Sequence, residues 1–185
     1  AILAVIQNPA KTEDMLELIS RMEAWNIYGY SEETVRRFFN GPSLSLGNIQ
    51  AAYASFLSSL NDYRNYKTLN YYPQKIASQK EQLVTQREYY NRILKQAPVM
   101  SEQFRTSRNI FDRDSILLSK NVISENEYDV SKNSFLQNKQ SYLSFSASLK
   151  QSEVQLMKGE ENLLDLQQQA TELERKYRLS LQNAV

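Results

Sequence analysis

Residues 104–135 read FRTSRNIFDRDSILLSKNVISENEYDVSKNSF, and they contain the end of one apolar ladder, a short polar interval and the start of a second ladder. In each ladder an apolar residue returns every seven positions. The first ladder is Ile76, Leu83, Tyr90, Ala97, Phe104, Phe111 and Leu118, and the second is Tyr128, Phe135, Tyr142, Leu149, Leu156, Leu163, Ala170 and Tyr177. A strict seven-residue repeat keeps one stripe on one side of a helix, so we expect each segment to bury its stripe against a partner helix.

The polar interval from Ser119 to Ile123 is too short for anything except an antiparallel return. The sequence therefore predicts an all-α fold dominated by a long antiparallel coiled-coil helical hairpin over residues 73–185, with its tip near 119–124. Pro98 falls within the first arm. We expect a kink there and no break, because the ladder keeps its phase across the proline. Gly159 in the second arm indicates either close helix approach or a tolerated, exposed glycine.

The two ladders also predict a register for the arms. Residues that lie level should have numbers that add to 246. The predicted level pairs are Leu118 with Tyr128, Phe111 with Phe135, Phe104 with Tyr142, Ala97 with Leu149, and Leu83 with Leu163. The same rule places Tyr177 level with residue 69, below the start of the first arm.

The chain before residue 73 is predicted to build a base beside the hairpin. Ala1 to Gln7 is typical of a short strand that ends at Asn8-Pro9. Helical stretches are expected at about 12–25, 31–39 and 46–70, within a base segment over 11–72, and two shorter helices should pack on the lower end of the second arm. Thr12 and Ser31 are the predicted helix caps, and Gly41 suits a left-handed position after the second helix. The expected result is a four-helix base that narrows to a two-helix tip.

Composition argues against most chemical functions. The chain has 22 Lys and Arg against 21 Asp and Glu, interleaved throughout, so no basic run indicates nucleic acid. The absence of Cys and His removes thiol and imidazole chemistry and the usual zinc ligands. Carboxylate pairs such as Glu160-Glu161, or Glu172 with Glu174, are better explained as solvated surface than as acid–base partners. We therefore expect neither an enzyme nor a cofactor, and the twelve tyrosines are interpreted as helix-packing residues.

The predicted tip has its own local pattern. Ser124 and Glu127 have capping-box spacing, in which the hydroxyl accepts from the third helical amide and the carboxylate accepts from the cap amide. Arg113 and Leu117 lie one helical turn apart on the preceding arm. The residues Lys120, Asn121, Val122 and Ile123 make the turn between them. Each feature alone fits a surface arginine, a seam leucine and a structural cap.

Taken together, Arg113-x3-Leu117-x6-Ser124 straddling a hairpin tip resembles the haemolysin D-type membrane fusion proteins, also called periplasmic adaptors. The run VISENEYDVSKNSFLQNK that begins at Val122 is similar to their "ISxxEYDxAK" pattern. It departs from that pattern at Val130-Ser131, where the family more often has small residues such as Ala. The opening AILAVIQNPAKTEDML resembles the end of a half-lipoyl motif, which would occupy residues 1–10. NYYPQKIASQKEQL is similar to adaptors of a Bacteroides-like branch.

The resemblance implies a protein that links an inner-membrane transporter, expected to be of the ABC type, to a TolC-like outer-membrane channel for secretion or efflux. It implies a periplasmic location, with an inner-membrane anchor in the full-length protein and a soluble fragment here. Several hairpins would assemble into a homo-oligomer, expected to be a hexamer, with Arg113, Leu117 and Ser124 as channel contacts. The alternative is a structural coiled-coil module that dimerises or braces another assembly without a channel. The residues alone name neither the cargo nor the particular channel.

Overall fold

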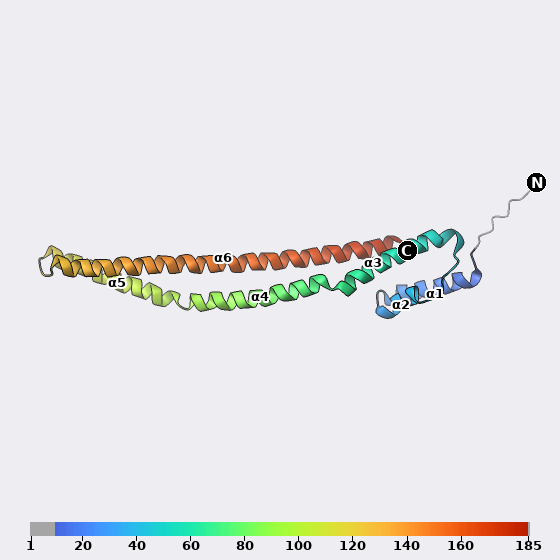
Figure 1. Ribbon diagram of the computed structural model, residues 1–185, viewed down its shortest axis with the longest axis horizontal. Helices are drawn as coiled ribbons and strands as arrows, with labels where there is room; N and C mark the ends of the chain where they lie inside the picture. Colours follow the sequence, from blue (N-terminus) through green and yellow to red (C-terminus); the bar gives the residue numbers. More distant parts are fainter. Residues whose placement is uncertain (1–9, 185) are drawn as a thin grey trace, which may run out of the picture. The chain divides into compact units, whose positions relative to one another are not determined.

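The computed structural model describes residues 10–184, and over that range it is built from helices without a β-strand (Figure 1). The predicted all-α class is confirmed for this part of the chain. The predicted strand from Ala1 to Gln7 lies outside the described residues. The elements in chain order are α1 (Thr12–Tyr28), α2 (Glu32–Phe39), the 3-10 helix η1 (Gly47–Ile49), α3 (Gln50–Leu69), α4 (Tyr71–Leu94), α5 (Ala97–Ser119) and α6 (Glu125–Ala184).

The helices divide into two compact units. Among the described residues, the first unit comprises 10–74 and 168–184, and the second comprises 75–167. Helices α4 and α6 therefore contribute to both units.

The first unit has one apolar core, to which α1, α2, α3 and the end of α6 all contribute. Its buried members are Val35, Phe38, Leu44, Leu46, Tyr53, Phe56, Leu60, Tyr63 and Leu181. Trp25 of α1 meets two of these rings edge to face, with centroids 6.1 Å from Phe38 and 5.8 Å from Phe56. Edge-to-face contacts of this kind add to the stabilisation that burial provides. Residues of α1, α2 and α3 thus share this core with Leu181 near the end of α6.

Polar contacts join α3 to the end of α6. Lys67 Nζ lies 2.7 Å from Glu174 Oε1, and the Tyr63 hydroxyl donates to the same oxygen over 3.2 Å. The hydrogen bond from Lys67 lowers the pKa of the Glu174 carboxyl. Tyr177 meets the rings of Tyr63 and Tyr66 at 6.3 and 5.1 Å. The register predicts residue 69 as the partner of Tyr177, and that prediction is wrong. Helix α3 ends at residue 69, and Asn70 adopts a left-handed φ of 46°, so the seven-residue spacing of the first ladder cannot be extended through it.

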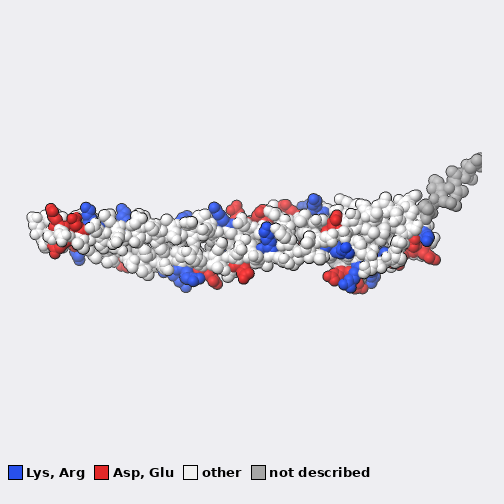
Figure 2. Space-filling model, in the orientation of Figure 1, with Lys and Arg blue, Asp and Glu red and all other residues white. Residues whose placement is uncertain are grey.

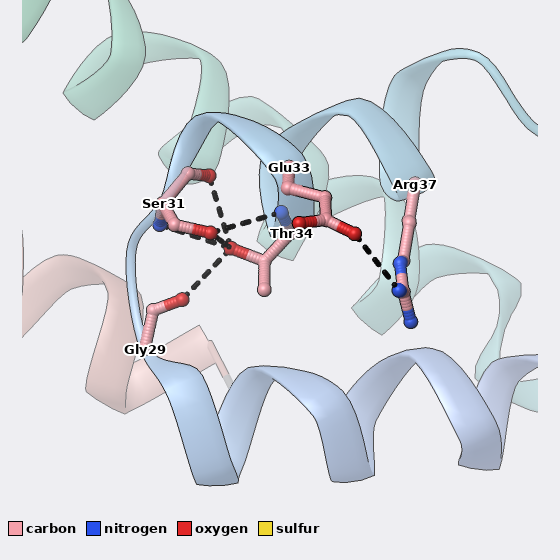
Figure 3. A network of polar contacts seen from close by, with 5 residues as sticks. All are labelled: Gly29, Ser31, Glu33, Thr34 and Arg37. Carbon is pink, nitrogen blue, oxygen red and sulfur yellow. Dashed lines mark hydrogen bonds and ion pairs between the residues drawn. The ribbon is translucent and has the colours of Figure 1, made fainter.

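Helix α2 begins where the sequence predicts, at a cap formed by Ser31 (Figure 3). The Thr34 amide donates to Ser31 Oγ over 3.1 Å, and the Ser31 amide donates to Thr34 Oγ1 over 2.9 Å. The predicted cap of α1 at Thr12 is wrong, because Lys11 occupies that position without a side-chain cap bond. The acidic residue Asp14 instead accepts a hydrogen bond from the Ser45 amide over 2.8 Å, which holds the segment before η1 against α1.

Gly41 does not have the left-handed conformation that the sequence predicts. Among the described glycines only Gly29 and Gly47 have positive φ. A Cβ at residue 41 would instead lie 2.2 Å from Nη2 of Arg21. Arg21 is only 4% exposed, and its Nε pairs with Glu17 over 2.8 Å. The glycine is therefore required for close approach of the guanidinium group and not for a turn conformation.

In the second unit, α5 and α6 contact each other through a run of aromatic rings. Phe111 stacks on Phe135 with centroids 4.9 Å apart, and Phe104 stacks on Tyr142 at 5.0 Å, so both aromatic pairs predicted from the register are in contact. Phe104 also lies 5.9 Å from Phe135, which links the layers. Lower numbers on α5 meet higher numbers on α6, so the two helices run in opposite directions at these layers. Every ladder residue within the described chain is buried or half-buried.

The first arm is interrupted where only a kink was expected. Helix α4 ends at Leu94 and α5 begins at Ala97, with Pro98 as its second residue. Pro98 has no amide to donate to the carbonyl of Leu94, and its ring crowds that carbonyl. The Gln96 amide donates to the Ile93 carbonyl over 2.9 Å. This bond spans three residues, as in a 3-10 helix, and not the four of an α-helix. The proline therefore ends one helix and starts another.

Gly159 lies at a close approach between α6 and α4. The residue is buried, and the amide nitrogen Nε2 of Gln79 donates to its carbonyl over 3.3 Å. A Cβ there would lie 2.8 Å from both Leu83 Cδ2 and Gln86 Oε1. Of the two interpretations that the sequence leaves open, the structure therefore has close helix approach.

Candidate functional site

The end of α5 closes in a Schellman motif. Asn121 has a left-handed φ of 54°, and its amide donates to the Leu118 carbonyl over 2.9 Å. The Val122 amide reaches back to the Leu117 carbonyl, also over 2.9 Å. These two bonds satisfy carbonyls that the helix end leaves free, and asparagine tolerates the left-handed conformation better than most residues. The turn is therefore defined by its backbone.

The start of α6 is closed just as firmly. The Ser124 amide donates to Glu127 Oε2 over 2.9 Å, and the Glu127 amide donates to Ser124 Oγ over 3.3 Å. This is the capping box that the sequence predicts. Only Ile123 lies between the last residue of the Schellman motif, Val122, and the first residue of the capping box, Ser124. The whole connection is therefore a short, hydrogen-bonded turn.

The capping box makes the turn sensitive to acid. Hydrogen bonds from the Ser124 amide and hydroxyl lower the pKa of the Glu127 carboxyl below its ordinary value of 4.5. A lowered pKa in the folded chain means that the cap is fully formed above pH 4.5 and is lost as the pH falls through the folded pKa. An NMR titration of the Glu127 side chain should therefore give a midpoint below 4.5, with the Ser124 amide signal following it. A midpoint at or above 4.5, or a Ser124 signal that Glu127→Gln leaves unchanged, would contradict the capping box.

The predicted site residues lie on both sides of this turn. Arg113 and Ser124 are exposed and Leu117 is half-buried, while its carbonyl accepts the bond from Val122. Of the turn residues, Lys120, Asn121 and Val122 are exposed and Ile123 is half-buried. Arg113 comes four residues before Leu117 on α5, so both are on one side of that helix. The structure thus places a cation, an apolar residue and a hydroxyl within two helical turns of one defined bend.

The sequence does not reveal the partner of Arg113. Its Nε lies 3.1 Å from Oδ1 of Asp114, whose side chain is only 15% exposed. Asp114 comes three residues after the ladder residue Phe111. In a seven-residue repeat, the position three after the ladder residue is the second one that faces the partner helix. That spacing could have identified it as a polar residue in the seam.

A second feature that the sequence reasoning missed is an exposed apolar stripe on α6. Leu136, Leu143, Met157 and Leu164 are between 49 and 67% exposed and share the seven-residue spacing. Each comes one position after a half-buried member of the second ladder, and Lys150 takes the place between Leu143 and Met157. The spacing itself was the available signal. The described chain leaves this stripe uncovered.

Charge and chemistry elsewhere are unremarkable. Lys and Arg side chains are interspersed with Asp and Glu over the face drawn in Figure 2. Among the described residues, no three carboxylates are gathered as ligands for a metal ion. None of the described helices has both the length and the apolar character needed to cross a membrane.

Comparison of the chain with protein-family models, with curated proteins and with solved structures finds no significant match.

Proposed function

We propose that the chain is the helical hairpin of a periplasmic adaptor, which links an inner-membrane transporter to a TolC-like outer-membrane channel for export. The observation that carries the proposal is the turn between α5 and α6, where Arg113, Leu117 and Ser124 keep the spacing of the haemolysin D-type tip on a bend closed by two capping motifs. A docking tip must hold its shape while exposed, and backbone capping on both sides meets that need.

In this proposal α4 and α5 form one arm of an antiparallel coiled coil and α6 forms the other. The stacked pairs Phe111–Phe135 and Phe104–Tyr142 support the pairing near the turn. The close approach at Gly159 and the ion pair of Arg87 with Glu160 support it farther from the turn. Regular layers of this kind suit a long projection that extends from the inner membrane toward an outer-membrane channel.

Each tip residue has a role that fits its exposure. Leu117 buries apolar surface against the channel, Arg113 donates to carbonyls or carboxylates at the facing helix ends, and Ser124 hydrogen-bonds across the joint. Each contact is weak by itself. Identical tips in a ring engage together, so the whole interface is much stronger than one copy of it.

The exposed stripe on α6 supports assembly of several copies. An apolar row at seven-residue spacing is what a helix presents to a neighbouring helix, and Leu136, Leu143, Met157 and Leu164 supply one that the described chain leaves uncovered. We propose a homo-oligomer, with six copies as the expected number, held in the periplasm by an inner-membrane anchor on the full-length protein. The resemblance supports a transporter of the ABC type.

The same stripe favours the second candidate function, a coiled-coil module that braces another assembly without a channel. The two functions differ in what meets the turn. In an adaptor the turn touches an outer-membrane protein, whereas in a bracing module the stripe alone makes contacts. A photo-reactive residue in place of the exposed Val122 of the full-length protein, in the cells that produce it, separates them. Cross-links from position 122 to an outer-membrane channel support the adaptor. If a photo-reactive residue in place of Leu143 on the stripe forms cross-links and the one at position 122 forms none, the bracing module is supported.

A further inference from the structure

Asp114 occupies a position where a carboxylate costs stability. It lies between the ladder residues Phe111 and Leu118 on α5, and its side chain is 15% exposed. Seven residues earlier the equivalent residue, Ser107, is buried and satisfies its hydroxyl on the Phe104 carbonyl. A charge that is largely removed from water is unfavourable unless it is paired and hydrogen-bonded. An apolar residue would suit this place in the seam better.

The contact that Asp114 makes is unusual for its position. Consecutive residues on a helix point apart, yet Nε of Arg113 lies 3.1 Å from Oδ1 of Asp114. Among the described residues, the structure gives the Asp114 carboxylate no other hydrogen bond or ion pair. Asp114 also lies near Glu127, and although the Ser124 hydrogen bonds lower the pKa of Glu127, the negative charge of Asp114 opposes that lowering. The neighbouring capping box therefore does not benefit from this carboxylate either.

The exposed partner gains from the same contact. The Arg113 side chain is 66% exposed, and a free arginine there would sample many rotamers. The bond to Asp114 uses Nε alone, so the two terminal nitrogens keep their donors for another molecule. A guanidinium group held in one orientation loses less freedom when it forms a forked pair with a carboxylate or with carbonyl groups.

From this geometry we propose that Asp114 is a positioning residue, which holds the Arg113 guanidinium group in its docking orientation at the tip. The inference rests on the proposed docking function and deepens it, because it assigns the partner a carboxylate or carbonyl group that meets the terminal nitrogens of Arg113. It explains why a carboxylate is kept in the seam, since function and stability make opposite demands on this residue.

Docking is measured by the yield of cross-links from a photo-reactive residue at position 122 of the full-length protein. Asp114→Asn, which keeps the shape and removes the charge, should lower the yield about three- to tenfold. In an Arg113→Ala background the same change should have no further effect, because no guanidinium group remains to be positioned. Asp114→Leu should also lower the yield, while its melting temperature stays equal to that of the original chain or rises. Loss of melting temperature in proportion to the yield, or an equal effect of Asp114→Asn in both backgrounds, would overturn the inference.

A second readout needs no partner. In a nitrogen-15 NMR spectrum of the protein, the Arg113 Nε–H signal should be resolved and protected from exchange with water, and Asp114→Asn should return it to the position of freely exposed arginines. A signal that is unprotected in the original chain overturns the positioning role, whatever the docking result. If the signal behaves as expected but Arg113→Ala leaves the cross-link yield unchanged, the proposed docking function fails and the positioning role in docking fails with it.

Discussion

Arg113→Asp and Leu117→Asp in the full-length protein are each expected to abolish docking and the export that depends on it. Arg113→Asp replaces an exposed donor with a charge that repels the carbonyl and carboxylate groups it would meet. Leu117→Asp introduces a charge into surface that is to be buried, and burial of an unpaired charge is strongly unfavourable. We expect a loss of at least about tenfold for one tip, and identical tips in a ring multiply it.

The measurement is export of cargo by cells together with cross-linking from position 122. Arg105→Asp is the matched control, since Arg105 is on the same helix, is 70% exposed and pairs with Glu102 three residues before it. It should leave both measurements close to their original values. Survival of export and cross-linking in both tip variants would remove the docking assignment, and equal loss in Arg105→Asp would show a general sensitivity of the helix to charge reversal.

Gly159→Leu should destabilise the chain by about 1–3 kcal/mol, because the new side chain must displace Leu83 and Gln86 from a packed approach. The sign of the effect is the informative part. At an exposed helix position the same replacement stabilises a protein, since leucine favours the helix over glycine by somewhat under about 1 kcal/mol. Chemical unfolding followed by circular dichroism measures the free energy of unfolding directly.

Ala147→Leu is the control for this change, because Ala147 is exposed on the same helix. Its free energy of unfolding should stay within about 0.5 kcal/mol of the original value. A Gly159→Leu chain that is as stable as the control or more stable would mean that α4 does not approach α6 at this point, and the paired arms would lose their strongest support away from the turn.

The features that could be predicted from the sequence are those set by spacing and by local backbone donors. The seven-residue ladders predicted the contacts of Phe111 with Phe135 and of Phe104 with Tyr142, because a periodic stripe fixes which residues face the partner. The caps at Ser31 and Ser124 can be predicted because a cap needs only residues three positions away. The sequence also predicts that Arg113 and Leu117 precede the turn and that Ser124 follows it, and they do so in the structure.

The features that could not be predicted depend on contacts between distant residues. The run Asn40-Gly41-Pro42 indicates that a helix ends there, but only the folded chain reveals that the Arg21 side chain lies where a Cβ of residue 41 would be. Pro98 left the ladder in phase, so the sequence did not reveal that the backbone divides into α4 and α5. The partner that the sequence predicts for Tyr177 depends on extending the register through Asn70, and the left-handed conformation of Asn70 interrupts that register. The pairing of Arg113 with Asp114 runs against the usual orientation of helical neighbours, so spacing alone could not suggest it.

We expect the chain to double back at Asn121, so that α5 and α6 run side by side in opposite directions. The absence of cysteine from the chain allows two spin labels to be placed without background, at Arg105 and Leu143, which are exposed and adjoin the stacked pair Phe104 and Tyr142. Pulsed electron resonance on the protein, diluted with unlabelled copies so that each distance lies within one chain, should give a label separation below about 30 Å, as neighbouring helices require. A separation above about 50 Å, which is the span of a continuous helix over these residues at about 1.5 Å per residue, would show that the chain does not double back at Asn121.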